Sequence, residues 1–351
     1  MATLVDENNR KTDGVEQRIA MRLRDADVGA PVAEVMRDLM AAGLDHIPLP
    51  GHGATLKRWQ ALERVARHDL GLVKLYEGHT DALAILQEID VHPPSSAATL
   101  RAVWASEARA EPMTIRSVEG TRAIIGGRKS WCSGARVVDE GLMTAVDPTG
   151  KRWLVAVKLS AAGITIDETR WNAVGMRGSA SFDVVCDGVD ARVVGASGAY
   201  LERRGFWHGG AGIAACWFGA AASIGARVRD LQRGRDDVHA LAHLGAIDAT
   251  LASGAALLRE AAAAIDLAPG RDAMRIALRA RGAVSDVCEG VIHHAMRAIG
   301  AGPLCNEADL AQRVADLPIF IRQSRAEHDQ VAQARALLAD EREMRDVGWA
   351  L

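Results

Sequence analysis

The chain has 351 residues, of which 49% are hydrophobic and 25% charged, and its formal net charge at pH 7 is −3. This composition is typical of a soluble globular protein with a substantial core, and the slight acidity gives no reason to expect a nucleic-acid partner. Apolar runs fall short of the roughly 20 residues that cross a bilayer, and the polar residues 1–17 contain no signal-peptide core. We therefore expect a cytoplasmic protein with a frayed N-terminus and no membrane partner.

The five cysteines indicate reduced thiols rather than disulfides. Their number is odd, and no two of them form a C-x-x-C pair. Such thiols usually pack as small hydrophobic side chains. His293 and His294 are adjacent and point in different directions on a helix, so we expect no metal site.

The first part of the chain is predicted to be helical. Apolar residues recur at three-to-four spacing in 32–40 and again in 62–86, which predicts amphipathic helices. The turn-forming run 48–53 separates the two patterns, and the Pro- and Ser-rich run 92–96 is a candidate linker.

Residues 100–194 change to short β-type runs. An Asp-Pro-Thr-Gly sequence at 147–150 separates two of them and predicts a hairpin turn. We expect a small antiparallel barrel or sandwich here. The predicted strands are 102–104, 122–125, 143–146, 153–157 and 182–185.

From residue 205 onward Ala, Leu and Arg dominate, and the pattern is again helical. Breaks are predicted at the Ala-Pro-Gly of 268–270 and the Gly-Ala-Gly-Pro of 300–303. The order of secondary structure is thus α, then β, then α. The predicted long helices are 207–231, 237–266, 271–299 and 307–340.

Two motifs in the β-rich region carry the strongest functional signal. Residues 127–135 read GRKSWCSGA, and residues 171–184 read WNAVGMRGSASFDV. A Trp face, a short hydroxyl and a Gly at a strand end suit a flat redox ring, because the Trp packs on it, the hydroxyl bonds its edge and no Cβ blocks its approach. In this order and spacing the motifs resemble the K-x-W-x-[ST]-x-G loop and the G-[MI]-R-G-S turn of the acyl-CoA dehydrogenase flavoproteins.

The resemblance implies an α+β multidomain fold. It comprises an N-terminal helical domain (1–99), a middle antiparallel β-barrel (100–198) and a C-terminal four-helix bundle (199–351). The implied reaction, in fatty acid metabolism, is α,β-dehydrogenation of an acyl thioester of CoA or a carrier protein. A carboxylate removes the α-proton while the β-hydrogen leaves as hydride to flavin N5. An electron-transfer flavoprotein is the type of acceptor that the resemblance implies.

The same resemblance assigns residues to an FAD cofactor. It implies that Trp131 packs on the ring, Ser133 hydrogen-bonds near N5 and Ser106 contacts the pyrimidine edge. The alternative interpretation of Trp131 is an aromatic residue that packs in the core of the barrel. Family members complete the FAD site from a neighbouring subunit, so a homodimer or a tetramer is expected. The residues matching that contribution are His239, Arg297 and Gly300. An arginine at a helix end is more often a solvated cap than a ligand, and this is the alternative for Arg297.

The base that the resemblance requires is not where most family members carry it. Their C-terminal Tyr-Glu-Gly-Thr segment corresponds to Ser324 here. The branch that includes isovaleryl-CoA dehydrogenase places its base in a Leu-Glu-Arg segment after the barrel, which matches residues 201–203. We therefore predict Glu202 as the base and Arg203 near the CoA phosphates, with Glu327 as the rival. An exposed helix-start pair is the equal alternative for Glu202 and Arg203.

Three further residues are candidates for substrate contact. Glu77 aligns with a helix that floors the acyl pocket of the family. Ser179 is expected to reach the CoA pantetheine or phosphates, with a plain turn residue as the alternative. His208 is a candidate proton-transfer group, and a buried, hydrogen-bonded histidine is the alternative.

Two other functions remain open on the same fold. A flavin-dependent monooxygenase or oxidase would lack the carboxylate base and carry His and Asp near the C-terminal helix, as His328 and Asp329 do here. A cofactor-free partner subunit would retain the flavin loops as scaffold. The contracted run 107–112 and the missing C-terminal Glu favour that third interpretation.

Overall fold

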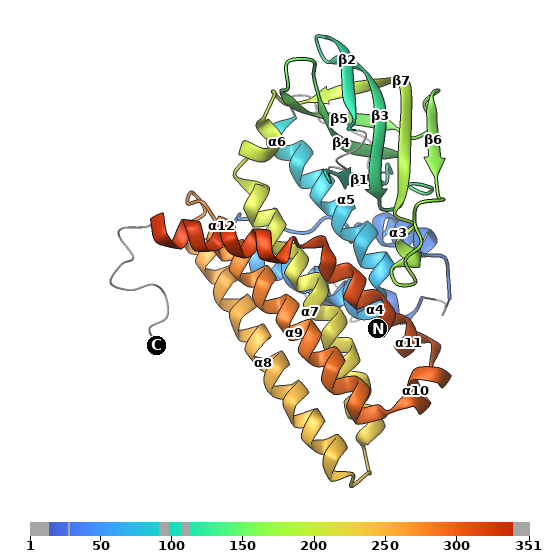
Figure 1. The fold of residues 1–351 in the computed structure, drawn as a ribbon, viewed down its shortest axis with the longest axis vertical. Helices are drawn as coiled ribbons and strands as arrows, with labels where there is room; N and C mark the ends of the chain where they lie inside the picture. Colours follow the sequence, from blue (N-terminus) through green and yellow to red (C-terminus); the bar gives the residue numbers. More distant parts are fainter. Residues whose placement is uncertain (1–13, 27–28, 91–97, 107–111, 340–351) are drawn as a thin grey trace, which may run out of the picture.

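The computed structural model describes residues 14–26, 29–90, 98–106 and 112–339, and Figure 1 shows a β-barrel standing on a long helical bundle. Four helices of the described residues precede the barrel. They are α2 (Val15–Arg24), α3 (Val32–Ala41), α4 (Thr55–His68) and α5 (Leu70–Ile89). The last three confirm the sequence prediction.

The expected frayed start lies mostly outside the described residues, and helix α2 follows it. It begins at Val15, and its two buried residues Ile19 and Leu23 belong to the main hydrophobic core. An amphipathic helix of 10 residues gains its stability from such tertiary packing rather than from propensity. The candidate linker 92–96 and the contracted run 107–111 lie outside the described residues.

Helix α5 is the central element that joins the two halves of the molecule. Asp69 caps its N-terminus by accepting a hydrogen bond from the Leu72 N–H at 2.6 Å. Most of its 20 residues are buried, because one side packs against the barrel and the other against α4 and α7. Residues on α5 therefore lie between the barrel and the bundle.

In the described residues, seven strands form the barrel. They run in the spatial order β1-β4-β2-β3-β7-β5, with β6 beside β7, and a β4–β5 pairing closes the sheet. Most pairs are antiparallel as predicted, but β1 and β2 pair with β4 in parallel. The strands are β1 (Arg101–Trp104), β2 (Thr114–Glu119), β3 (Arg122–Cys132), β4 (Glu140–Val146), β5 (Arg152–Lys158), β6 (Ile164–Asp167) and β7 (Phe182–Val194).

The predicted hairpin turn is confirmed between β4 and β5. Asp147 accepts hydrogen bonds from the Thr149 hydroxyl, the Trp153 indole N–H and the backbone of Thr149 and Lys151. The Thr149 hydroxyl and the Trp153 indole are the main causes that hold the pKa of Asp147 at about 2. This turn presents the start of β5 to the helical layer.

The C-terminal region is helical, as predicted. After the short α6 (Ala199–Glu202) come three long helices, α7 (Gly205–Gln232), α8 (Val238–Leu267) and α9 (Met274–Ile299). The single helix predicted at 307–340 is instead divided. A 3₁₀ turn (Ile321–Gln323) and the extended Ser324 interrupt it, giving α11 (Ala308–Phe320), which contains Pro318, and α12 (Ala326–Ala339). A short α10 (Ala301–Asn306) fills part of the break predicted at 300–303.

Helices α7 and α8 are both long and apolar enough, by length and composition, to cross a membrane. Their environments differ. In its most apolar 18-residue window α7 is 78% buried as the core of the bundle, whereas α8 is only 17% buried in its own window. Helix α8 thus presents an apolar face on the outside of this chain (Figure 1).

Candidate functional site

The two sequence motifs meet in space at one end of the barrel. The Gly134 N–H donates to the Ser179 carbonyl oxygen at 2.8 Å. The hydroxyls of Ser133 and Ser181 lie 2.8 Å apart, and Ser181 lies 2.8 Å from the Ser179 hydroxyl. Segments that are 40 residues or more apart in sequence therefore form a single structure.

This structure holds an unusual backbone. Among the described residues, those other than glycine with positive φ are Trp131 (61°), Met176 (58°) and Ala180 (43°), and all three fall in the two motifs. The left-handed conformation costs an L-amino acid roughly 1–2 kcal/mol. Such strain clusters at functional sites and persists only where the surroundings enforce it.

Two buried carboxylates enforce it here. Asp183, 4% exposed, accepts a hydrogen bond from the Trp131 N–H at 3.3 Å. Asp316 of α11, also 4% exposed, accepts one from the Met176 N–H and a second from the Gln312 side chain. Burial raises the pKa of Asp316 above its usual value, and these hydrogen bonds oppose the rise. The carboxylates thus fix the geometry of both loops, one from within the barrel and one from the bundle.

A cavity of about 210 Å³ lies between the barrel and the helices. Ser106 lines it and also donates its hydroxyl to the Ser130 carbonyl oxygen at 2.9 Å, which ties the cavity wall to the Trp131 motif. Trp131 and Ser133 are not part of the wall. Trp131, the residue after Ser130, is 58% exposed. It is therefore not the barrel-core aromatic of the alternative interpretation. The lining residues are Ala105, Ser106, Thr144, Arg152, Trp153, Gly198, Tyr200, Leu201 and Arg325.

The wall of this cavity is basic. Arg152 from the start of β5 and Arg325 from the segment before α12 contribute guanidinium groups, and Ser106, Thr144 and Tyr200 contribute hydroxyls. Among the described residues that line the cavity, none is Asp or Glu. Paired guanidinium groups of this kind favour anionic ligands such as phosphates.

The two predicted base candidates both lie outside the wall. Glu202 ends α6 with its side chain exposed, directly after the wall residue Leu201. Glu327, at the start of α12, is exposed as well. Ser324 donates its hydroxyl to Asp329 at 2.9 Å, and Asp329 is also paired with Arg281 at 3.0 Å. The position of the usual glutamate is thus part of a structural contact between α9 and α12.

Charged side chains of α4 and α5 form two ion pairs close enough to Tyr200 to affect its pKa. Lys74 donates to Glu77 at 2.7 Å, and Arg58 of α4 donates to Asp81 at 2.8 Å. Burial raises the pKa of the Glu77 carboxyl, against the effect of Lys74. Burial also raises the pKa of Tyr200 to about 12, and the negative charges of Asp81 and Glu77 add to that rise. Glu77 is therefore a paired carboxyl near the cavity rather than part of its wall.

Arg203 and His208 are buried at the junction of α6 and α7. Arg203 donates to Glu88 at 3.0 Å and lies 5.5 Å from the centre of the Tyr200 ring. Its Nε and the His208 Nε2 are buried with no hydrogen-bond partner among the described residues. His208 packs on Gly51, and burial lowers its pKa. Both side chains are thus part of the interior rather than of the cavity wall.

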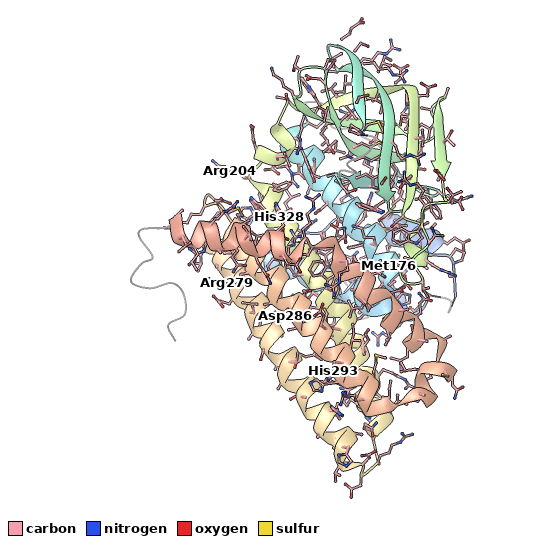
Figure 2. The ribbon with its side chains drawn as sticks, in the orientation of Figure 1. Met176, Arg204, Arg279, Asp286, His293 and His328 are labelled. Carbon is pink, nitrogen blue, oxygen red and sulfur yellow. The ribbon has the colours of Figure 1, made fainter. Side chains whose placement is uncertain are left out.

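Ser179 and the predicted intersubunit residues lie elsewhere. Ser179 is fully buried and its hydroxyl donates to the Met176 carbonyl oxygen, so it is oriented inward rather than toward a substrate. His239 begins α8, while Arg297 and Gly300 lie at the end of α9, at the end of the bundle remote from the barrel (Figure 1). Figure 2 places His293, a few residues before them, in the same lower part of the bundle.

Sequence reasoning missed the side chains that make the cavity basic. Arg152 follows a hairpin turn and Arg325 lies between two helices, and neither position carries a local signal. Tyr200 and Trp153 are aromatic and lie close to segments that the sequence singled out. Their role appears only when β5, α6 and the segment before α12 are brought together.

No protein-family model matches the chain, and no curated protein sequence matches it. Solved structures do match it along most of its length. FMN-bound TdsC, a dibenzothiophene monooxygenase from Paenibacillus sp. A11-2, is 17% identical, with a TM-score of 0.77 over 92% of this chain and 96% of that one. The nitrososynthase from Micromonospora carbonacea var. africana is 18% identical, with a TM-score of 0.75 over 93% and 94%.

A chain of the electron transferring flavoprotein structure from Acidaminococcus fermentans is 16% identical, with a TM-score of 0.78 over 93% of this chain and 97% of that one. At these identities the likeness concerns the fold. The chain has the acyl-CoA dehydrogenase-like fold, a mixed helical and sheet structure with a small closed barrel and a helical C-terminal region.

Proposed function

We propose that this chain is a flavin-dependent monooxygenase that binds its flavin between the Trp131 loop and the basic cavity. Among the structural neighbours are an FMN-bound monooxygenase and a nitrososynthase. The observation that carries the choice of reaction is the cavity wall, whose described residues include two arginines and three hydroxyl groups but no carboxylate. Abstraction of an α-proton from an acyl thioester needs a general base, which the resemblance implies to be a carboxylate.

The residues present fit a flavin. The exposed, left-handed Trp131 presents an indole face suited to a planar ring. Ser133 lies two residues further along the chain, and the Ser106 hydroxyl is hydrogen-bonded to the carbonyl oxygen of the preceding Ser130. Arg152 and Arg325 suit the phosphate of FMN or the pyrophosphate of FAD. A bound flavin supplies hydride transfer and, when reduced, chemistry with O₂. The protein positions the ring and keeps water from the buried side of the cavity.

The test uses purified protein supplied with chemically reduced FMN or FAD and then with air. We expect the protein to bind the flavin and to delay its reoxidation, as followed by the flavin absorbance. Arg325→Gln should weaken binding of FMN about tenfold or more, since one charge-assisted hydrogen bond contributes about 1.5–3 kcal/mol. Arg322→Gln, at an exposed arginine paired with Glu289, is the matched control. Equal binding by both variants would contradict the assignment of the cavity.

A second candidate is dehydrogenation of an acyl thioester with Glu202 as base. It is favoured by the position of Glu202 directly after Leu201 in the cavity wall. Anaerobic titration of the flavin-loaded protein with a panel of acyl thioesters distinguishes the two reactions. Bleaching that disappears in Glu202→Gln but persists in Glu327→Gln would establish the dehydrogenase and refute the monooxygenase. If the protein binds neither oxidised nor reduced flavin, the non-catalytic partner subunit is the interpretation that remains.

We also propose that the chain forms a homodimer or a tetramer through α8. Its exposed face carries small residues at alternating four- and three-residue spacing, and these lack charge. A second copy fits because small residues let two helices approach closely. His239, at the start of α8, and Arg297 and Gly300, at the adjacent end of α9, are the residues predicted to serve a neighbouring subunit. The small residues are Ala242, Gly245, Ala249, Ala252 and Ala256.

The oligomer is tested by molar mass in solution. Ala249→Glu should convert it to a monomer, whereas Val118→Glu, at an exposed position on β2, should leave the mass unchanged. A wild-type protein that is monomeric at micromolar concentration would refute the interface. If the protein instead floats with lipid vesicles in a density gradient, the exposed face of α8 binds a membrane rather than a second copy of the chain.

A further inference from the structure

The guanidinium group of Arg325 has no partner within the described part of the chain. It lines the basic cavity, but it forms no ion pair or hydrogen bond with a described residue. Arg322, three residues earlier, is by contrast paired with Glu289 of α9. A long side chain without a partner samples several rotamers, so its place at the wall depends on how firmly its backbone is held.

Apolar packing holds the backbone around Arg325 only weakly. No residue of α12 is buried, and α12 packs mainly on α9, across the end of the bundle that faces the barrel (Figure 1). On the other side of Arg325, the nearest residue anchored in the core is Ile321, which is 2% exposed. Ser324 is extended, so no continuous helix connects Arg325 to α11. The placement of Arg325 therefore depends on polar contacts.

Asp329 makes these polar contacts. Its backbone N–H donates to the Arg325 carbonyl oxygen at 2.8 Å, and its carboxylate accepts a hydrogen bond from the Ser324 hydroxyl at 2.9 Å. The same carboxylate pairs with Arg281 of α9 at 3.0 Å. One residue thus ties the chain on both sides of the Arg325 side chain to the bundle.

The ion pair between Arg281 and Asp329 is shielded from water. Its side chains are 18% and 20% exposed, whereas those of the neighbouring pair Arg322 and Glu289 are 61% and 50% exposed. Burial lowers the pKa of Arg281, and the charge of Asp329 opposes this change. An exposed pair contributes little to stability, but breaking a shielded one leaves a charge without its partner. Asp329 is therefore held on α9 more firmly than Arg322 is.

On the basis of the flavin binding proposed above, we infer that Asp329 is a positioning residue that holds Arg325 at the cavity wall and so makes the site prefer a flavin with a phosphate group. Asp329 is not among the residues that line the cavity, so it acts through Arg325. A guanidinium group binds phosphate oxygens by charge-assisted hydrogen bonds, and riboflavin has no phosphate. Loss of the Asp329 carboxylate should therefore reduce the affinity for FMN and leave that for riboflavin unchanged.

The test compares dissociation constants of FMN and riboflavin, both reduced with dithionite under anaerobic conditions, by equilibrium dialysis with the full chain. If the released segment keeps Arg325 at the wall for about a tenth to a third of the time, Asp329→Asn should weaken FMN binding by about 3- to 10-fold. Its effect on riboflavin should stay below about twofold. In the Arg325→Gln background, Asp329→Asn should weaken FMN binding no further, because both changes remove the same contact.

Glu289→Gln is the matched control. It also removes a carboxylate from an ion pair between α9 and this part of the chain, but the pair is the exposed one with Arg322. This variant should keep the wild-type affinities for both flavins. Ser324→Ala removes one contact of Asp329 and retains the pair with Arg281. It should also weaken binding of FMN but not of riboflavin, and it serves where Asp329→Asn lowers the melting temperature too far for measurement.

The outcomes separate the inference from the function on which it rests. Asp329→Asn protein that keeps the wild-type affinity for FMN, or loses affinity equally for FMN and riboflavin, would overturn the inference and leave flavin binding intact. An effect that persists in full in the Arg325→Gln background would overturn it too, since Asp329 would then act through another group. Wild-type protein that binds neither flavin would refute the proposed function, and the inference with it.

Discussion

At Gly175 the backbone of the second motif packs in close contact with the helical bundle. A Cβ atom added there would lie 2.1 Å from the Ala315 carbonyl oxygen, 2.7 Å from its carbon and 3.0 Å from the Asp316 Cα. All three atoms belong to the backbone of α11, so no side-chain rotation relieves the contact. Gly175→Ala must therefore push the turn away from α11.

The cost of this displacement can be estimated from the contacts it breaks. Overpacking of a well-packed site costs about 1–3 kcal/mol. Separation from α11 also weakens the hydrogen bond from the Met176 N–H to the buried Asp316 carboxylate, which contributes about 1.5–3 kcal/mol. We expect Gly175→Ala to lower the free energy of unfolding by roughly 2.5–6 kcal/mol, measured by urea denaturation with tryptophan fluorescence.

Gly178 in the same turn provides the control. Its added Cβ would meet the Gly71 Cα at 3.7 Å and a Val32 methyl at 3.9 Å, which are ordinary contacts. Gly178→Ala should change the free energy of unfolding by about 0.5 kcal/mol or less. If Gly175→Ala is as stable as the wild type, the turn does not pack in close contact with α11. If both variants lose the same stability, the effect is a general property of the turn.

Three further predictions concern the backbone strain and the histidine pair. Ala180→Gly should raise the free energy of unfolding by about 0.5–1 kcal/mol, because glycine tolerates the left-handed conformation at φ 43°. Trp131→Gly should be at least as stable as the wild type in thermal unfolding and yet lose flavin binding, and retained affinity would count against the indole as the ring's platform. His243 and His294 approach through their Nδ1 atoms at 2.9 Å, and burial and the neighbouring positive charges lower the pKa of His294. The folded state therefore favours neutral His294, so its contribution to stability is complete above the ordinary pKa of 6.5 and is lost as the pH falls below it. The melting temperature of wild-type protein should thus fall more between pH 7.5 and 5.5 than that of His294→Asn, and parallel curves would contradict this.

Much of the fold could be predicted because periodicity is a local property. The α, β, α order and three of the long C-terminal helices follow from apolar spacing, and the β4–β5 hairpin follows from its turn residues. The parallel pairing of β1 with β4 could not be predicted, since it joins strands about 40 residues apart. The division of the predicted helix 307–340 was missed because its apolar pattern continues through Pro318.

The site was predictable in the same local sense. Both motifs were found, and they do pack together, but the interactions that fix them come from distant residues. Asp316 lies 140 residues from Met176 in the chain. The basic cavity wall combines β5, α6 and the segment before α12, and no spacing rule connects Arg152 to Arg325. Long-range contacts of this kind exist only once the helical layer has packed on the barrel.

The distribution of positive φ values links the strain to function. Elsewhere in the described residues the chain uses glycine where φ is positive, including Gly127 and Gly134 at the two ends of the first motif. Met176 is 3% exposed, so core packing accounts for a side chain at that position. Trp131 has no such compensation, because its indole is 58% exposed while its backbone is strained and held by Asp183. A glycine would be less costly there for folding alone, and the indole is therefore best explained by a planar ligand that covers it.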